Sequence, residues 1–203
     1  MNKQRQQSNT TQHSYALIYK PCGVLCQFTD ESGRRTLADL GSFPSDMYPV
    51  GRLDADSEGL VLLSNDGPTK ARLLDPRSGH SRTYLVQVER IPSEISLEML
   101  RAGVSIEGRV TKEAVVRLLA EEPDIPPREV PIRLRKNVPT AWIELTITEG
   151  RNRQVRKMTA AVGHPTLRLI RIRIGHLTLD GLKPGGHRYL SPAEAQNLLT
   201  TVL

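Results

Sequence analysis

One short acidic loop holds the residues whose types and spacing could do chemistry. Residues 51–60 read Gly-Arg-Leu-Asp-Ala-Asp-Ser-Glu-Gly-Leu, which places Asp54 close to Arg52. The apolar run that begins at Leu60 predicts a buried strand, so we expect Asp54 at the lip of a rigid element. A carboxylate held there can act as a nucleophile, a base or a metal ligand.

The spacing of the loop leaves more than one interpretation open. Asp54, Asp56 and Glu58 are spaced like the start of a calcium-binding loop, but Asn65 stands where such a loop needs a bidentate glutamate, so we expect no metal. An aspartate beside a guanidinium is favoured in its charged form and can attack an electrophilic carbon or stabilise an oxocarbenium-like centre. Asp54 could also simply cap a turn.

A second segment, residues 149–158, reads Glu-Gly-Arg-Asn-Arg-Gln-Val-Arg-Lys-Met and belongs to a strongly basic region. Residues 128–173 hold 11 Lys and Arg against 3 acidic residues, whereas the rest of the chain holds 17 basic and 19 acidic residues. All of the net charge of +6 therefore comes from one segment. This segment is either a solvated basic face or, as we favour, the binding surface for a polyanion such as nucleic acid.

Composition limits the remaining possibilities. The 203 residues suit one domain, and two cysteines, Cys22 and Cys26, are too few for a disulfide framework or a zinc site. No stretch approaches the ~20 apolar residues of a membrane span. Residues 1–14 are polar and are expected to form a disordered tail. We therefore expect a soluble, cytoplasmic protein without a bound metal. We also expect a monomer.

Hydrophobic patterning predicts mixed strands and helices. The alternation of Ile170, Ile172 and Ile174 with Arg171 and Arg173 predicts a half-exposed strand with basic side chains. Five prolines in residues 121–139 predict a long loop. Because regular βαβ alternation is missing, we predict an α+β fold with a largely antiparallel or mixed central sheet flanked by helices. Other strands are expected at Tyr15–Tyr19, Leu60–Ser64, Arg82–Glu89 and Trp142–Thr148, and helices at Thr36–Leu40, Pro68–Leu74, Ser96–Arg101 (with Ser93 as N-cap), Asn152–Val162 (with Asn152 as N-cap) and Pro192–Val202.

Taken in order, the motifs resemble the RsuA type of bacterial ribosomal RNA pseudouridine synthase. The resemblance covers roughly residues 15–190. It is carried by Lys20-Pro21-Cys22-Gly23-Val24, the Gly51–Leu60 block, Arg82-Thr83-Tyr84, the Gly150–Met158 block, Gly163-His164-Pro165 and Leu169-Ile170-Arg171. Members often have lysine where Arg82 stands. Many also carry an amino-terminal RNA-binding module of the S4 type, which we do not expect here, so residues 15–203 would be the catalytic domain.

The resemblance implies a pseudouridine synthase fold with its active site in a cleft between two lobes. It implies that Asp54 breaks the N-glycosidic bond of a flipped uridine, that Tyr84 stacks on the base, and that Arg156 pairs with Asp54. A finer likeness, carried by Gln27-Phe28-Thr29-Asp30 and by Arg133-Leu134-Arg135-Lys136 in the proline-rich stretch, implies large-subunit (23S) ribosomal RNA as the substrate. The resemblance implies that no cofactor is needed. The residues expected to contact RNA are Arg52, Arg82, Arg133, Arg135, Lys136, Arg151, Arg153, Lys157 and Arg171. For Arg52 and Arg153 the resemblance also leaves open that they stabilise the acidic loop.

The alternative function is a non-catalytic RNA-binding protein of ribosome assembly, which would use the same basic surface. A hydrolytic glycosidase is a third class, and it would release free base instead of an isomer.

Overall fold

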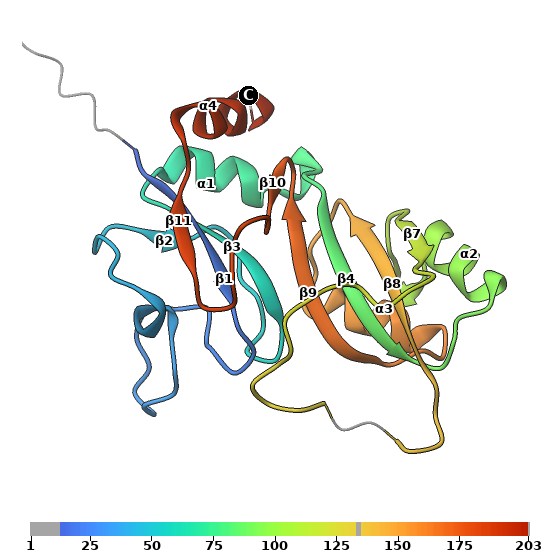
Figure 1. Ribbon diagram of the computed structural model, residues 1–203. Coiled ribbons are helices and arrows are strands. Elements are labelled where there is room, and N and C mark those ends of the chain that lie inside the picture. The colour runs from blue at the N-terminus through green and yellow to red at the C-terminus, as the bar shows by residue number, and fades with distance from the viewer. Residues whose placement is uncertain (1–12, 133–134, 203) are drawn as a thin grey trace, which may run out of the picture.

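The computed structural model describes residues 13–132 and 135–202. One mixed β-sheet extends across the molecule and takes strands from the beginning, the middle and the end of the described chain (Figure 1). Its strands are β1 (Tyr15–Lys20), β2 (Tyr48–Pro49), β3 (Glu58–Ser64), β4 (Arg82–Glu89), β7 (Val115–Leu118), β8 (Thr140–Ile147), β9 (Thr166–Ile174), β10 (Leu177–Thr178) and β11 (His187–Tyr189). The order is β11-β1-β3-β9-β4-β8-β7, with β2 paired to β3 and β10 to β9. The pairings between these named strands are all antiparallel except that of β3 with β9. The predicted α+β class is thus confirmed.

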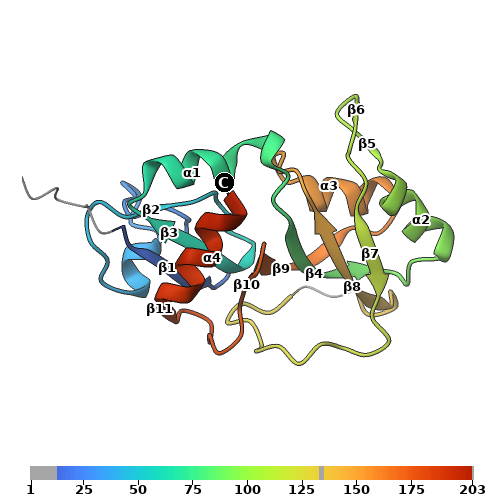
Figure 2. The same ribbon diagram turned by 90° about the horizontal axis from the view of Figure 1, so that it is seen from above.

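Helices and short elements complete the fold. The helices are α1 (Gly67–Leu74), α2 (Glu94–Ala102), α3 (Gln154–Ala161) and α4 (Pro192–Val202), with 3-10 turns η1 (Leu37–Leu40) and η2 (Pro76–Ser78) and a hairpin of β5 (Ser105–Ile106) and β6 (Arg109–Val110). Seen from above, α3 lies on one side of the sheet, and residues 119–132 and 135–139 of the loop lie on the other (Figure 2). The sequence patterns did not predict the hairpin or β7.

Most helix starts follow the capping chemistry of the sequence. Asp66 accepts a hydrogen bond from the Thr69 amide at the start of α1, and Ser93 accepts one from the Ser96 amide at the start of α2. The prediction that Asn152 caps α3 is wrong. The N-cap is Arg153, in the left-handed conformation with φ of 50° and without a side-chain cap, and Asn152 accepts instead from Lys157.

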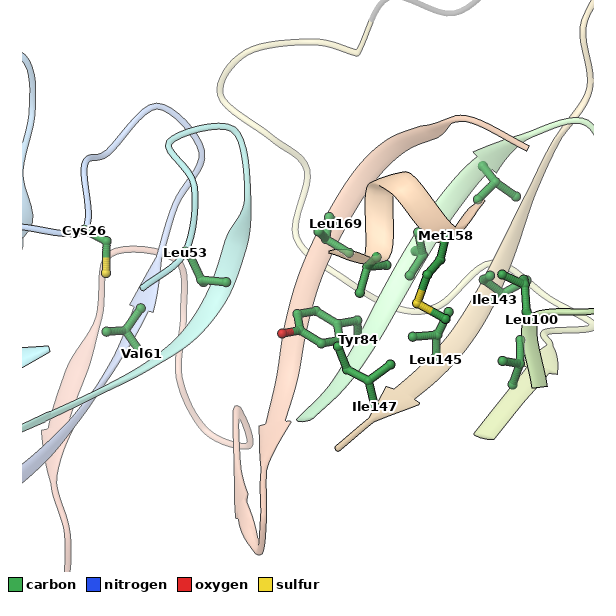
Figure 3. Close-up of a cluster of buried hydrophobic side chains, with 14 of the residues drawn as sticks. Cys26, Leu53, Val61, Tyr84, Leu100, Ile143, Leu145, Ile147, Met158 and Leu169 are labelled. Carbon is green, nitrogen blue, oxygen red and sulfur yellow. The ribbon is translucent and has the colours of Figure 1, made fainter. Parts of the chain in front are cut away.

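Apolar side chains pack on both faces of the sheet. On one face Val86, Ile143 and Leu145 pack with Met158 of α3 and Leu100 of α2 in a cluster that also reaches Leu53 and Tyr84 (Figure 3). On the other face Tyr19, Leu85, Trp142 and Ile170 pack with Ile125 of the 119–139 loop. In a third cluster Leu62 of β3 packs with Leu73 of α1 and Leu198 of α4. The sheet is therefore covered by packed side chains on both faces.

The sheet has two halves, one formed by β11, β1, β2 and β3 and the other by β9, β10, β4, β8 and β7. They meet where β3 begins. The parallel pairing of β3 with β9 joins Glu58 to Ile170 and Gly59 to Arg171. The Glu58 carboxylate, 3% exposed, accepts hydrogen bonds from Arg168 Nε at 2.9 Å and Arg168 Nη2 at 2.8 Å. Burial of this pair is tolerated because both carboxylate oxygens are satisfied. The acidic loop of residues 54–57 ends directly at this junction.

Candidate active site

A cavity of about 390 Å³ lies between the two halves of the sheet. Its walls come from the 51–54 segment and α1 on one side, from β4 and residues 147–155 on the other, and from β9 between them. The prediction of a cleft between two lobes agrees with this arrangement. Asp54, Tyr84, Arg52, Arg82, Arg151, Arg153 and Arg171 all line the cavity.

The acidic loop is held by backbone contacts. The Asp54 carbonyl accepts from the Ser57 amide at 3.1 Å, which closes a tight turn. The Ala55 carbonyl accepts from the Gly23 amide at 2.7 Å and from Lys20 Nζ at 3.3 Å. The Lys20-Pro21-Cys22-Gly23 motif therefore supports the loop from beneath and leaves the Asp54 side chain, 37% exposed, at the cavity wall.

Arg153 is the ion-pair partner of Asp54. Its Nη1 lies 3.3 Å from Asp54 Oδ2, and its Nη2 lies 3.0 Å from Asp56 Oδ2. The left-handed backbone of Arg153 turns this side chain from the start of α3 toward the loop. One guanidinium thus fixes two carboxylates, a geometry that its planar fork of donors allows.

Arg156 holds the other side of the loop. The pairing expected between Arg156 and Asp54 is replaced by one with Asp56, at 3.3 Å, and by bonds to the Asp56 carbonyl and Ser57 Oγ. Although partial burial opposes ionisation, the hydrogen bond from Arg153 and the charge of Arg156 hold the pKa of Asp56 below its ordinary value. Burial lowers the pKa of Arg156, and the nearby Asp56 works against that shift. The role expected for Arg156 is thus divided between two arginines.

Tyr84 forms the opposite wall. It is 7% exposed and packs among Ile147, Leu145 and Leu169. Its hydroxyl points out of this cluster toward the side where Leu53 lies (Figure 3). The ring is therefore both part of the core and part of the cavity surface, so the packing and functional interpretations of Tyr84 are compatible.

Other residues expected to contact RNA fall into different surroundings. Arg52 is exposed, whereas Arg82 is half-buried and donates to the Leu73 carbonyl. Arg171 is 3% exposed and donates to the Leu60 carbonyl, so the half-exposed strand predicted around it is wrong at this position, although Arg173 is exposed. Parallel pairing with β3 is what covers Arg171.

Away from the cavity, three expected RNA contacts are described. Lys157 pairs with Glu107 at 2.6 Å, and Arg135 lies 3.5 Å from Glu89. Lys136 is exposed in the 119–139 loop. Arg133 lies outside the described residues.

Sequence reasoning missed His80, which lines the cavity just before β4. Within the described part of the chain, His80 Nε2, Arg151 Nε and Arg171 Nη2 are buried without a hydrogen-bond partner, and all three residues line the cavity. The unpaired arginine nitrogens are donors and suit a polar ligand with acceptor atoms, whereas His80 Nε2 can donate or accept. Burial and the charge of Arg82 lower the pKa of His80, so its ring is favoured in the neutral form.

No cluster of three or more His, Cys, Asp or Glu within residues 13–132 and 135–202 is arranged to hold a metal ion. Over the same described ranges, no helix is long and apolar enough to cross a membrane.

Comparison with known proteins agrees with the motifs. Residues 14–161 match the family described as RNA pseudouridylate synthase. A protein of Xanthomonas axonopodis pv. citri (strain 306) named ribosomal large subunit pseudouridine synthase E is 55% identical over 83% of this chain and 89% of its own. Its namesake in Vibrio vulnificus (strain CMCP6) is 46% identical over 94% of this chain and 81% of its own.

The fold agrees as well. A crystal structure of a pseudouridylate synthase superimposes with a TM-score of 0.75 and 28% identity, covering 92% of this chain and 74% of that one. The family match spans the Asp54 loop, Tyr84 and the start of α3, the segments that form the cavity. By its sequence, its fold and the motifs around its cavity, the chain belongs to the RNA pseudouridine synthase family.

Proposed function

We propose that this protein converts a uridine of large-subunit (23S) ribosomal RNA to pseudouridine. Relatives named for the ribosomal large subunit, at 55% and 46% identity over most of the chain, support the choice of RNA. The catalytic assignment depends on the position of the Asp54 side chain. Its carboxylate stands at the wall of the cavity, in an ion pair with Arg153, across from the ring of Tyr84.

The reaction is an isomerisation and needs no added reactant. The bond between C1′ and N1 of uridine breaks, a bond between C1′ and C5 forms, the proton on C5 leaves, and N1 gains a proton. In our proposal the Asp54 carboxylate assists cleavage of the first bond as a nucleophile or as the counter-charge of an oxocarbenium-like sugar. Arg153 keeps that carboxylate oriented toward the cavity.

The target base must leave its stack to reach Asp54, which costs a few kcal/mol. Stacking on an aromatic face such as that of Tyr84 returns ~1–3 kcal/mol. Arg52, Arg82 and Arg151 line the cavity and would contact phosphates on either side of the flipped nucleotide, which sets the register of the strand. Arg156 acts on the loop through Asp56 and Ser57, and we assign it a positioning role.

Replacing Asp54 with asparagine tests the assignment. We expect Asp54→Asn to lower the rate of pseudouridine formation by about 10³-fold or more, as loss of a reacting group does, while RNA affinity stays within about threefold. Asp56→Asn is the matched control in the same loop. It should cost less because it loosens Arg153 and Arg156 without removing the reacting carboxylate.

The measurement is pseudouridine mapping in 23S RNA from cells that lack the protein and are complemented with each variant, together with binding to transcripts. Persistence of the modification with Asp54→Asn would show that another group reacts. If the wild-type protein binds ribosomal RNA but leaves no pseudouridine, the alternative assembly role is correct. Release of free base, detected by chromatography, would indicate a glycosidase.

A further inference from the structure

Arg128 belongs to the proline-rich loop but turns away from solvent. Its side chain is 13% exposed, whereas that of Arg135 in the same loop is 68% exposed. Ile125 of the loop packs against the cluster that holds Leu85 and Trp142. Arg128 is therefore poorly placed to contact a phosphate on the surface, although it lies in the most basic part of the sequence.

The Arg128 guanidinium bridges two segments. Its Nη2 donates to Cys22 Sγ, and its Nε lies 3.7 Å from Glu58 Oε1. The same carboxylate is clamped by Arg168, whose Nη2 also donates to the Pro126 carbonyl at 2.8 Å. The loop is thus fastened to the sheet junction by both a backbone and a side-chain contact.

The turn that contains Cys22 and the start of β3 at Glu58 both hold the Asp54 loop. Cys22 lies in the turn whose Gly23 amide binds the Ala55 carbonyl at 2.7 Å. Glu58 is the residue at which the loop ends and β3 begins. A side chain that contacts Cys22 and Glu58 together fixes the distance between the support and the end of the loop.

Arg128 also acts electrostatically on the site. Burial is the largest cause that lowers the pKa of Arg156, the charge of Arg153 adds to it, and the charge of Arg128 makes a smaller contribution in the same direction. The effect of Arg128 on the loop is therefore carried mainly by its contacts with Cys22 and Glu58.

We propose that Arg128 is a positioning residue for the reaction: through Cys22 and Glu58 it sets the place of the loop that carries Asp54. This inference rests on the proposed function and assigns to Arg128 a role distinct from RNA contact. A lysine cannot reproduce it fully, because the ammonium is a single point charge whereas the guanidinium reaches two partners in different directions.

The test compares Arg128→Met and Arg128→Lys with Arg35→Met. Arg35 is a suitable control because it pairs at 3.0 Å with Glu129 of the same loop but is exposed. Three quantities are measured on each full-length variant: the single-turnover rate at saturating RNA, the Kd for RNA, and the melting temperature.

We expect Arg128→Met to lower the saturating rate about tenfold or more with Kd changed less than about twofold, since only the reacting geometry is altered. Arg128→Lys should recover part of that rate, and Arg35→Met should match the wild type. If Arg128→Met does not fold, the single-turnover rate of Arg128→Lys at saturating RNA tests the proposal instead. A rate equal to that of the wild type would contradict it.

Three other results would overturn it. A weaker Kd with an unchanged saturating rate would make Arg128 an RNA contact. A lower melting temperature with an unchanged rate would make it a purely structural residue. Equal losses in Arg128→Met and Arg35→Met would point to the loop as a whole. The two proposals fail in different ways. If the proposed function is wrong, the wild-type protein forms no pseudouridine; if only the role of Arg128 is wrong, the wild type is active and one of the three results above is found.

Discussion

Lys20 is fully buried and its ammonium group is surrounded by carbonyl oxygens. It donates to Pro21 at 3.0 Å, Val24 at 2.7 Å and Ala55 at 3.3 Å, which uses all three of its donors. Burial lowers the pKa of Lys20 to about 8, although the neighbouring Cys26, Cys22 and Glu58 act in the opposite direction. Lys20 therefore supports the Asp54 loop although burial disfavours its charged form.

This lysine makes stability depend on pH. In the unfolded chain its pKa returns to 10.5, so between about pH 8 and pH 10 the unfolded state binds more protons than the folded state. Lys20 therefore contributes a rise of stability with pH in this window of up to ~3 kcal/mol, although the Cys26 thiol, whose pKa burial raises from 9.0, works against it in the upper part of the window. Burial raises the pKa of Tyr19 to about 12 from 10.0, so this tyrosine opposes the trend only at higher pH.

Urea unfolding as a function of pH checks the prediction. Lys20→Met should remove the rise, whereas Lys112→Met, which replaces an exposed lysine, should keep it. The same pH dependence in wild type and Lys20→Met would show that another group titrates in this range.

At the scale of elements, the junction of β3 with β9 depends on one glycine. Gly59 has a φ of +105°, and a Cβ built on it would lie 2.2 Å from the Arg171 carbonyl oxygen. The close approach brings Glu58 within reach of Arg168 and lets Arg171 donate to Leu60. A side chain at this position cannot be accommodated unless the strands separate.

We therefore expect Gly59→Ala to lower the free energy of unfolding by ~3 kcal/mol or more, from backbone strain and the clash together. Gly67→Ala is the control, because Gly67 has ordinary φ and nothing within 4 Å of its Cβ position. Urea denaturation of both variants gives the comparison. A similar, small change in both would mean that the junction opens at little cost.

Local patterns predicted most elements but not the contacts between distant ones. The strand of residues 82–89 and the cap at Ser93 depend on neighbouring residues, and both predictions are confirmed. The burial of Arg171 depends on a parallel partner more than a hundred residues away, which no local period reports. Likewise Asp54 could be singled out from its motif, whereas its pairing with Arg153 follows from a left-handed residue that no cap signal announces.

At the scale of the whole molecule, the basic segment faces in more than one direction. Arg168 and Arg171 are buried at the sheet junction, and Arg128 is turned inward. The excess charge of residues 128–173 therefore overstates what RNA can contact. Arg52, which lies outside that segment, is exposed and lines the cavity. Location relative to the cavity, rather than sequence density of charge, should decide which cations neutralise phosphates.

The salt dependence of RNA binding tests this distinction. Each phosphate neutralised on a single strand contributes about 0.7 to the slope of log K against log salt. Arg52→Ala should reduce the slope by about that amount. Arg173 is also exposed but lines a separate hollow with Ile170 and Ile172, so Arg173→Ala should leave the slope unchanged. Equal reductions would mean that RNA contacts both faces of the sheet, because a phosphate near Arg173 cannot belong to a strand confined to the Asp54 cavity.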